Sequence, residues 1–241
     1  MKRFDEWVKI RDKKLYEDIT QDEFGDENSD KKKELIVLIG PPAVGKSTYI
    51  ASKFKPDDVF VVSRDDIVDQ VAGENNFTYD DMFELPPPDT ALRSIVVGKE
   101  KFGVVKEAPV WMKWTKLVYS KIQDANERIN NLLQQRFSDA VDSGKNIVVD
   151  MTNMTASARK NSLKYADKKD YFRRAVVFTL NDSDLPALLK RMRDRSEEIK
   201  QKGGSKTIGD DVVNRMIASF EKVKPEEGFD KIETINNFRL N

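Results

Sequence analysis

The chain has 241 residues, and its 42 basic side chains balance its 42 acidic ones, so any contact with a polyanion must be local. The absence of cysteine and histidine excludes disulfides, thiolate zinc sites, a cysteine nucleophile and an imidazole general base, which leaves a carboxylate or a lysine for proton transfer. No apolar run approaches membrane-spanning length, so we expect a cytoplasmic protein without membrane contact.

The first 33 residues differ from the rest of the chain. Phe4, Trp7, Leu15 and Ile19 recur at roughly helical spacing, which predicts one amphipathic helix. The stretch that follows is charged and almost free of aliphatic residues, which is typical of a solvated linker. We expect a helix that packs on the domain or on a partner, and the sequence does not identify that partner.

Residues 40–48, GPPAVGKST, follow an apolar run at 35–39 and fit the phosphate-binding pattern G-x-x-x-x-G-K-[ST] between a strand and a helix. Such a turn points backbone N–H groups at one spot, where the helix N-terminus adds partial positive charge. Lys46 is predicted to reach the β- and γ-phosphates and the Ser47 hydroxyl to hold Mg²⁺. The predicted contacts of a nucleoside triphosphate in this loop are Gly40, Ala43, Val44, Gly45, Lys46, Ser47 and Thr48. The alternative, a glycine-rich turn by chance, has to explain strand, lysine and hydroxyl together.

From residue 35 onward strand and helix signals alternate, the pattern of parallel βαβ units. The sequence predicts an α/β P-loop fold over residues 34–241, with a parallel sheet of about five strands flanked by helices. After the first strand, the expected strands are 59–62, 146–150, 174–180 and 231–235, and a long helix is expected over about 111–141. An irregular insertion at 75–109 contains the proline cluster LPPPDT, and it is either a substrate-facing flap or a passive loop.

Ser63-Arg64-Asp65-Asp66 follows the second expected strand directly. Ligands bind at the carboxyl ends of parallel strands, so a carboxylate here could accept the proton of an attacking hydroxyl beside the phosphate-binding loop. We predict Asp65 as this general base. The alternative is a helix N-cap at Asp65, with Asp66 as a first-turn carboxylate.

Asp150-Met151-Thr152-Asn153 follows the third expected strand. Asp150 could support Mg²⁺ or its waters, and it could equally hold an arginine or cap the next helix. That helix begins near residue 156 and carries several basic residues, which form either a local phosphate-binding face or an ordinary solvated one. We predict that the acceptor contacts Arg64, Asp66, Thr152, Asn153 and Arg159.

Arg191 and Arg195 lie four residues apart on an amphipathic helix that begins near residue 184, so they share one face. A lid over about 184–210 could place these guanidinium groups on ATP and on the transferring phosphoryl group, like an arginine finger in cis. The polar stretch after the helix contains Gly203-Gly204 and is expected to be mobile. Surface salt bridges are the alternative role for both arginines.

The order of these motifs resembles the kinase module of bacteriophage polynucleotide 5'-kinases over about residues 35–225. The resemblance implies a P-loop kinase fold with a helical lid, ATP and Mg²⁺ as cofactors, a DNA or RNA 5'-hydroxyl as acceptor, and the host cytoplasm as location. It also implies Asp65 as the base, Lys46 and Ser47 on the phosphates and Mg²⁺, and Asp150 and Arg195 in the site. The family's companion phosphatase motif is absent.

The chain departs from this family at Val68, where the family commonly has an arginine that holds the acceptor-side phosphate. A phage DNA kinase acting on 5-hydroxymethyluracil is therefore an alternative, in which Trp111 and Trp114 could stack a flipped base, although tryptophans in such a pattern are more often core residues. Two further functions remain as alternatives: a small-metabolite or toxin-type kinase, and a nucleotide-dependent switch.

Overall fold

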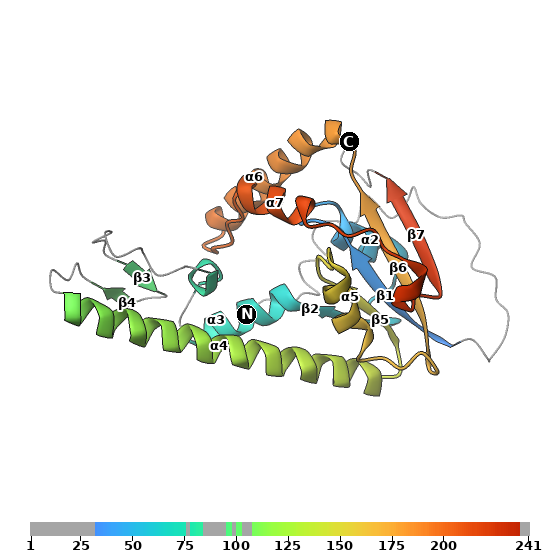
Figure 1. Cartoon of the computed structure of the whole chain (residues 1–241), viewed down its shortest axis with the longest axis horizontal. Helices are drawn as coiled ribbons and strands as arrows, with labels where there is room; N and C mark the ends of the chain where they lie inside the picture. The colour runs from blue at the N-terminus through green and yellow to red at the C-terminus, as the bar shows by residue number, and fades with distance from the viewer. Residues whose placement is uncertain (1–31, 76–77, 84–94, 98–99, 103–107, 237–241) are drawn as a thin grey trace.

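The computed structural model describes residues 32–236 except 76–77, 84–94, 98–99 and 103–107 (Figure 1). Over 95–97, 100–102 and 108–123 it describes the backbone alone. The predicted N-terminal helix therefore lies outside the described residues, as do the side chains of Trp111 and Trp114.

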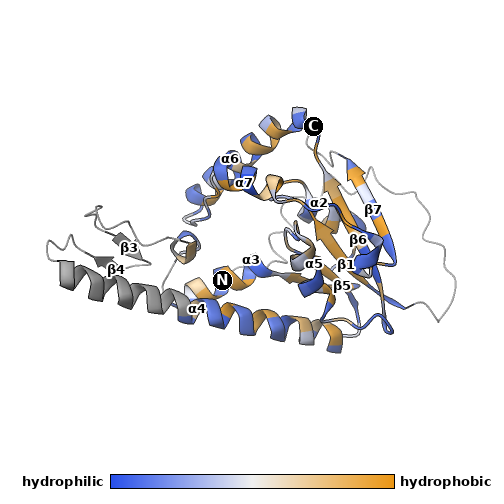
Figure 2. Cartoon of the chain, in the orientation of Figure 1, coloured by the Kyte–Doolittle hydropathy of each residue, from blue (hydrophilic) through white to orange (hydrophobic). Residues whose placement is uncertain are grey.

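Five parallel strands form the central sheet, as the alternating pattern predicts. They are β1 (Lys33–Ile39), β2 (Val59–Ser63), β5 (Asn146–Asp150), β6 (Tyr171–Thr179) and β7 (Lys231–Asn236), in the order β2-β5-β1-β6-β7. Short runs rich in valine and isoleucine are typical of strands that are buried on both faces. Figure 2 shows hydrophobic residues, in orange, along the strands of this sheet.

Side chains alternate between the two faces of β1, and each face has its own core. Leu35, Val37 and Ile39 pack with Phe137 and Ala140 of α4 (Ala108–Asp142) and with Leu163 of α5 (Ala156–Leu163). On the other face, Ile36 and Leu38 pack with residues of α2 (Lys46–Lys53), α6 (Leu185–Gln201) and α7 (Asp210–Ala218). The sheet is thus covered by helices on both faces, which confirms the predicted α/β class.

Helix α3 (Arg64–Glu74) follows β2 and packs on α4. A third apolar cluster fills this contact, and Val68 of α3 is fully buried in it. Because position 68 faces this core, a charged side chain there would be buried against α4. The valine at the family's arginine position therefore fits the packing of this chain.

The insertion predicted as irregular contains regular elements. These are the 3₁₀ turn η1 (Asp80–Phe83) and an antiparallel hairpin of β3 (Ile95–Val97) and β4 (Glu100–Phe102). Short 3₁₀ turns and three-residue strands carry too few residues to produce a visible period in the sequence. Two further 3₁₀ turns, η2 (Asp182–Asp184) and η3 (Pro225–Glu227), precede α6 and β7. No helix in the described part of the chain is long and apolar enough to cross a membrane.

Candidate active site

The phosphate-binding loop connects β1 to α2 and adopts the strained backbone that such loops require. Ala43 has φ of 59° and Gly45, the residue before α2, has φ of 106°. A non-glycine residue with positive φ costs energy and is concentrated at functional sites. A side chain at Gly40 would place its Cβ 3.0 Å from Cβ of Phe178 and 3.1 Å from Cγ1 of Val44, so glycine is required there by close packing.

Lys46 is buried at the start of α2 and its ammonium is held by the loop itself. Nζ donates hydrogen bonds to the carbonyl oxygens of Gly40 at 2.9 Å and Pro41 at 2.8 Å. Burial lowers the pKa of Lys46, while the charges of Asp150 and Asp65 act to raise it. Ser47 and Thr48 follow Lys46 in the N-terminal turn of α2, where a phosphate and its metal ion are favoured. Ser47 is exposed and Thr48 is half-buried.

The parallel pairing brings the second and third predicted motifs together. Ser63 at the end of β2 is in register with Asp150 at the end of β5, and β5 is hydrogen-bonded to β1. The predicted common rim of the sheet is therefore present. Mutual effects on pKa place Lys46, Asp65 and Asp150 in one electrostatic cluster.

Asp65 lies in the first turn of α3 with both carboxylate oxygens accepting hydrogen bonds. Lys206 Nζ is 2.6 Å from Oδ2, and the Tyr79 hydroxyl donates to Oδ1 at 3.1 Å. The N-cap of α3 is Ser63, whose hydroxyl accepts from the backbone N–H of Asp66. The alternative assignment of Asp65 as the N-cap is therefore wrong. The carboxylate of Asp65 therefore does not cap the helix and contacts Lys206 and Tyr79 instead.

Burial alone would raise the pKa of Asp65, but the charge and hydrogen bond of Lys206, the hydrogen bond from Tyr79 and the charge of Lys46 outweigh it and lower this pKa. Burial and the charge of Asp65 raise the pKa of Tyr79, so its hydroxyl stays protonated and remains a donor. Asp65 is thus kept ionised beside the phosphate-binding loop.

Lys206 is a site residue that the sequence analysis missed. It lies in the segment 202–209 between α6 and α7, its side chain is 14% exposed, and its charge also acts on the pKa of Lys46 and Asp150. The same segment is fixed by the backbone N–H of Thr207, which donates to Oδ1 of Asp80 at 2.7 Å. Glycines and charged residues around position 206 give no pattern that marks one lysine, and its partner Asp65 is 141 residues away.

Asp150 and Asp66 complete the acidic part of the cluster. Burial is the largest cause that raises the pKa of each, and the charge of Asp65 raises both further. Oxygen donors of this kind suit Mg²⁺, which takes one or two protein oxygens and leaves its other positions to water and phosphate. Among the described residues, no group of three or more histidine, cysteine or acidic side chains is placed to hold a metal ion.

Arg191 and Arg195, the two arginines of the predicted lid, lie near the phosphate-binding loop. Arg191 Nη1 of α6 is 3.5 Å from the carbonyl oxygen of Ala43, which joins the lid to the loop. Arg195 is exposed one turn further along, and its charge lowers the pKa of both Lys46 and Asp150. Both positions fit the predicted contacts with ATP and with the transferring phosphoryl group, and these roles remain predictions.

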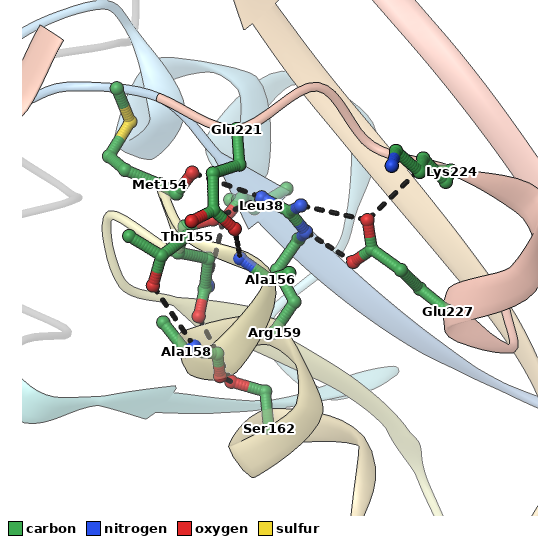
Figure 3. A network of polar contacts seen from close by, with 11 residues as sticks. Leu38, Met154, Thr155, Ala156, Ala158, Arg159, Ser162, Glu221, Lys224 and Glu227 are labelled. Carbon is green, nitrogen blue, oxygen red and sulfur yellow. Dashed lines mark hydrogen bonds and ion pairs between the residues drawn. The ribbon is translucent and has the colours of Figure 1, made fainter. Parts of the chain in front are cut away.

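The structure corrects the predicted role of Arg159. Its side chain is 0% exposed, Nε and Nη2 donate to the Glu227 carboxylate at 2.6 and 2.8 Å, and Nη1 donates to the carbonyl oxygens of Asn153 and Met154 (Figure 3). A guanidinium with all these partners and no exposed surface cannot hold an acceptor phosphate. Arg159 is instead a structural link between α5 and η3.

The predicted acceptor contact of Asn153 is also wrong, because this residue is buried and its side chain makes its hydrogen bonds inside the protein. Nδ2 donates to the Leu38 carbonyl at 2.9 Å, and Oδ1 accepts from the Ser162 hydroxyl at 3.0 Å. Thr152 accepts from the Gly40 N–H through its carbonyl oxygen at 3.0 Å. These bonds fasten the loop after β5 to the end of β1, so Asn153 shapes the site without reaching a substrate. The Thr152 hydroxyl and Arg64, both half-buried, remain predicted acceptor contacts.

Replacing Arg159 by methionine is expected to lower the free energy of unfolding by about 3 kcal/mol, because the Glu227 carboxylate loses its buried partner. The hydrogen bond from Arg159 lowers the pKa of Glu227 in the folded protein. The pair therefore stabilises the fold fully at pH values above the ordinary pKa of a glutamate. This stabilisation is lost as the pH falls through the lowered pKa of Glu227 in the folded protein. Urea unfolding measures this effect: the free energy of unfolding should differ less between pH 7 and pH 3 in the variant than in the wild type.

A comparison with family models matches residues 35–223 to the family described as AAA domain. Because the match covers most of the chain, the protein belongs to this family, and its sheet and loop are those of a P-loop kinase-type domain. The match carries nothing specific to phage polynucleotide kinases, so that narrower resemblance stays a prediction. The comparison with curated proteins gave no match.

Solved structures of similar shape are remote in sequence. One, from the PezAT chromosomal toxin–antitoxin system of Streptococcus pneumoniae, is 13% identical, with 87% of this chain and 70% of that chain covered and a TM-score of 0.48. Another, from Chloroflexus aurantiacus and proposed to be a kinase, is 13% identical, with 86% and 87% covered and a TM-score of 0.46. A gluconokinase from Sinorhizobium meliloti is 14% identical, with 86% and 83% covered and a TM-score of 0.34. These similarities carry no argument about the reaction of this chain.

Proposed function

We propose that this P-loop domain is an ATP-dependent kinase that transfers the γ-phosphoryl group to a hydroxyl of a nucleic acid, with a DNA or RNA 5'-hydroxyl end as the preferred acceptor. The observation that carries the proposal is the position of the Asp65 carboxylate, which is held by Lys206 and Tyr79 and interacts electrostatically with Lys46 of the phosphate-binding loop. A nucleotide switch needs the loop but has no use for a base aimed at an acceptor.

In the proposed reaction Asp65 accepts the proton of the acceptor hydroxyl. The hydroxyl oxygen forms a bond to the γ-phosphorus, the bond from that phosphorus to the β–γ bridging oxygen breaks, and ADP leaves with the electron pair. A carboxylate has about four lone-pair sites, so the two bonds from Lys206 and Tyr79 leave room for the hydroxyl. Lys46, Arg191 and Arg195 supply the positive charge that the phosphoryl group needs.

Mg²⁺ fits the oxygen donors at the rim, where Ser47 and Asp150 would hold it or its waters. When bound, the ion neutralises charge on the β- and γ-phosphates. This chain's own contribution is to keep Ser47 exposed at the start of α2 and Asp150 at the end of β5.

The nucleic-acid acceptor is supported by the motif order and by the cations around Asp65. Arg159 is paired with Glu227 and position 68 is buried, so neither can hold an acceptor phosphate. Lys206 contacts the candidate base, and Arg64 precedes it in the sequence. One or two cations suit a short contact with the end of a strand.

The test is transfer of label from γ-labelled ATP to a panel of acceptors. The panel contains 5'-hydroxyl DNA, 5'-hydroxyl RNA, 5'-blocked DNA with 5-hydroxymethyluracil, and free nucleosides. We expect label at the 5' end of an unmodified strand. Label on the blocked strand would replace this proposal with base phosphorylation, and label on nucleosides alone would indicate a small-metabolite kinase.

Replacing Lys206 by methionine is expected to move the acid limb of the pH profile of kcat/KM to higher pH. Lys206 lowers the pKa of Asp65, so its loss raises that pKa and protonates the base over a wider acid range. Tyr79 and Lys46 still lower this pKa in the variant, while Asp66, Asp69 and Asp150 are the acidic groups of the same cluster. Lys206→Arg keeps the charge and should retain the wild-type profile. An unchanged profile in Lys206→Met would show that the ion pair does not act on the base.

A further inference from the structure

Two aromatic side chains form a pair beside the candidate base, and one of them, Phe83, has no role in the reaction described above. The ring centroids of Tyr79 and Phe83 are 5.0 Å apart at an interplanar angle of 42°. Phe83 is 52% exposed, which makes it the most exposed large hydrophobic side chain among the described residues. The exposed ring of Phe83 is thus open to contact by a ligand, and the Tyr79 side chain connects it to the candidate base.

The pair is fixed to the catalytic group through Tyr79. The Tyr79 hydroxyl donates to Asp65 while its ring contacts Phe83, so one side chain separates the exposed ring from the candidate base. Lys206 Nζ lies 4.4 Å from the centroid of the Tyr79 ring. Because the ammonium lies over the Tyr79 ring, Phe83 is the ring of the pair with most of its surface left for a ligand.

The turn that carries Phe83 is anchored, so its exposure follows from the fold. Met82 is buried in the cluster between α3 and α4, and its N–H donates to the Tyr79 carbonyl at 3.2 Å. Asp80 accepts from the Thr207 N–H. With Met82 turned into the core and Asp80 held by the lid segment, Phe83 is left on the outside of η1 as a preorganised flat surface.

We propose that Phe83, supported by Tyr79, is a stacking site for the nucleobase of the acceptor nucleotide. This inference rests on the proposed function and specifies how the acceptor is recognised. An aromatic face binds any unpaired base, because every base offers a π-face, and an adjacent cation adds attraction for the strand's phosphates. The site thus favours an unpaired terminal nucleotide and gives little discrimination between bases.

The test compares acceptors with and without a terminal base. Phe83→Ala should raise the KM of a 5'-hydroxyl strand with a terminal adenine by about 5- to 150-fold, the range of one lost base–aromatic stack. The same variant should leave the KM of a strand with an abasic terminal residue unchanged, and Phe83→Trp should restore the wild-type KM for adenine. Phe220→Ala is the matched control, because Phe220 is also an exposed phenylalanine, at 40%, and lies just after α7.

A binding measurement separates this inference from the proposed function. The fluorescence of 2-aminopurine at the 5' end of a strand should be quenched by the wild type and by Phe220→Ala, and much less by Phe83→Ala. Quenching without any transfer of label would support the stacking site and overturn the kinase proposal. Transfer of label with equal KM changes for the adenine and abasic strands, or equal quenching by the wild type and Phe83→Ala, would overturn the stacking site alone.

Discussion

Replacing Lys46 by methionine is expected to reduce phosphoryl transfer by about 10²- to 10³-fold or more, the usual loss when one charge-stabilising donor is removed from a reacting oxyanion. In the structure the ammonium is held by the carbonyl oxygens of Gly40 and Pro41 inside the loop. ATP phosphates are far stronger acceptors than these two carbonyl groups, so the ammonium is expected to turn to them when the nucleotide binds. Transfer of label from γ-labelled ATP measures the effect.

The same substitution should change the free energy of unfolding little. Burial lowers the pKa of Lys46, which means that the folded protein holds this charge at a cost, and methionine keeps the apolar part of the side chain. Lys53→Met, in the last turn of the same helix and exposed, is the matched control and should retain full activity. More than a tenth of the wild-type activity in Lys46→Met would contradict the assignment of the loop.

The sheet could be predicted from the sequence because its strands are buried on both faces. Such strands consist of short runs of valine, isoleucine and leucine, and the runs at 59–62 and 146–150 coincide with β2 and β5 to within one residue. The turn η1 and the β3–β4 hairpin could not be predicted. They are too short to show a period, and contacts with other elements decide their conformation.

The phosphate-binding loop and Asp65 could be predicted for a related reason. A parallel sheet collects the carboxyl ends of its strands at one edge, so a polar residue directly after a strand already has an approximate place in the site. Ser63 and Asp150 are in register at this edge, as that rule requires. The local sequence thus contains enough information for residues that directly follow strands.

The local sequence is not sufficient for Arg159 and Lys206. Arg159 follows the third strand closely and was predicted to reach the acceptor, but Glu227, 68 residues further on, captures its guanidinium inside the protein. Lys206 could not be singled out within its polar segment, because its role depends on a contact with Asp65, 141 residues earlier in the chain. Whether a charged side chain faces a ligand or a buried partner depends on such long-range pairs, which a single sequence does not encode in a readable pattern.

Replacing Asp65 by asparagine is expected to reduce turnover by about 10²- to 10⁴-fold, the usual loss of a general base. Asparagine has nearly the same shape and its oxygen can still accept a hydrogen bond, but the amide does not take up the hydroxyl proton. Affinity for ATP should change little, because the base acts on the acceptor. Glu74→Gln, at the last residue of α3 and also exposed, should stay near wild-type activity as the matched control.

A double-mutant cycle with Lys206→Met separates a general base from one half of an ion pair. If Asp65 only anchored the segment that carries Lys206, both single variants would lose similar activity, and the double variant would lose no more than either. If Asp65 is the base, Asp65→Asn should cost orders of magnitude more turnover at neutral pH than Lys206→Met, whose effect should be concentrated at acid pH. Loss of ATP binding in Asp65→Asn would instead place this carboxylate in the nucleotide or metal site, and the acceptor proton would need another base.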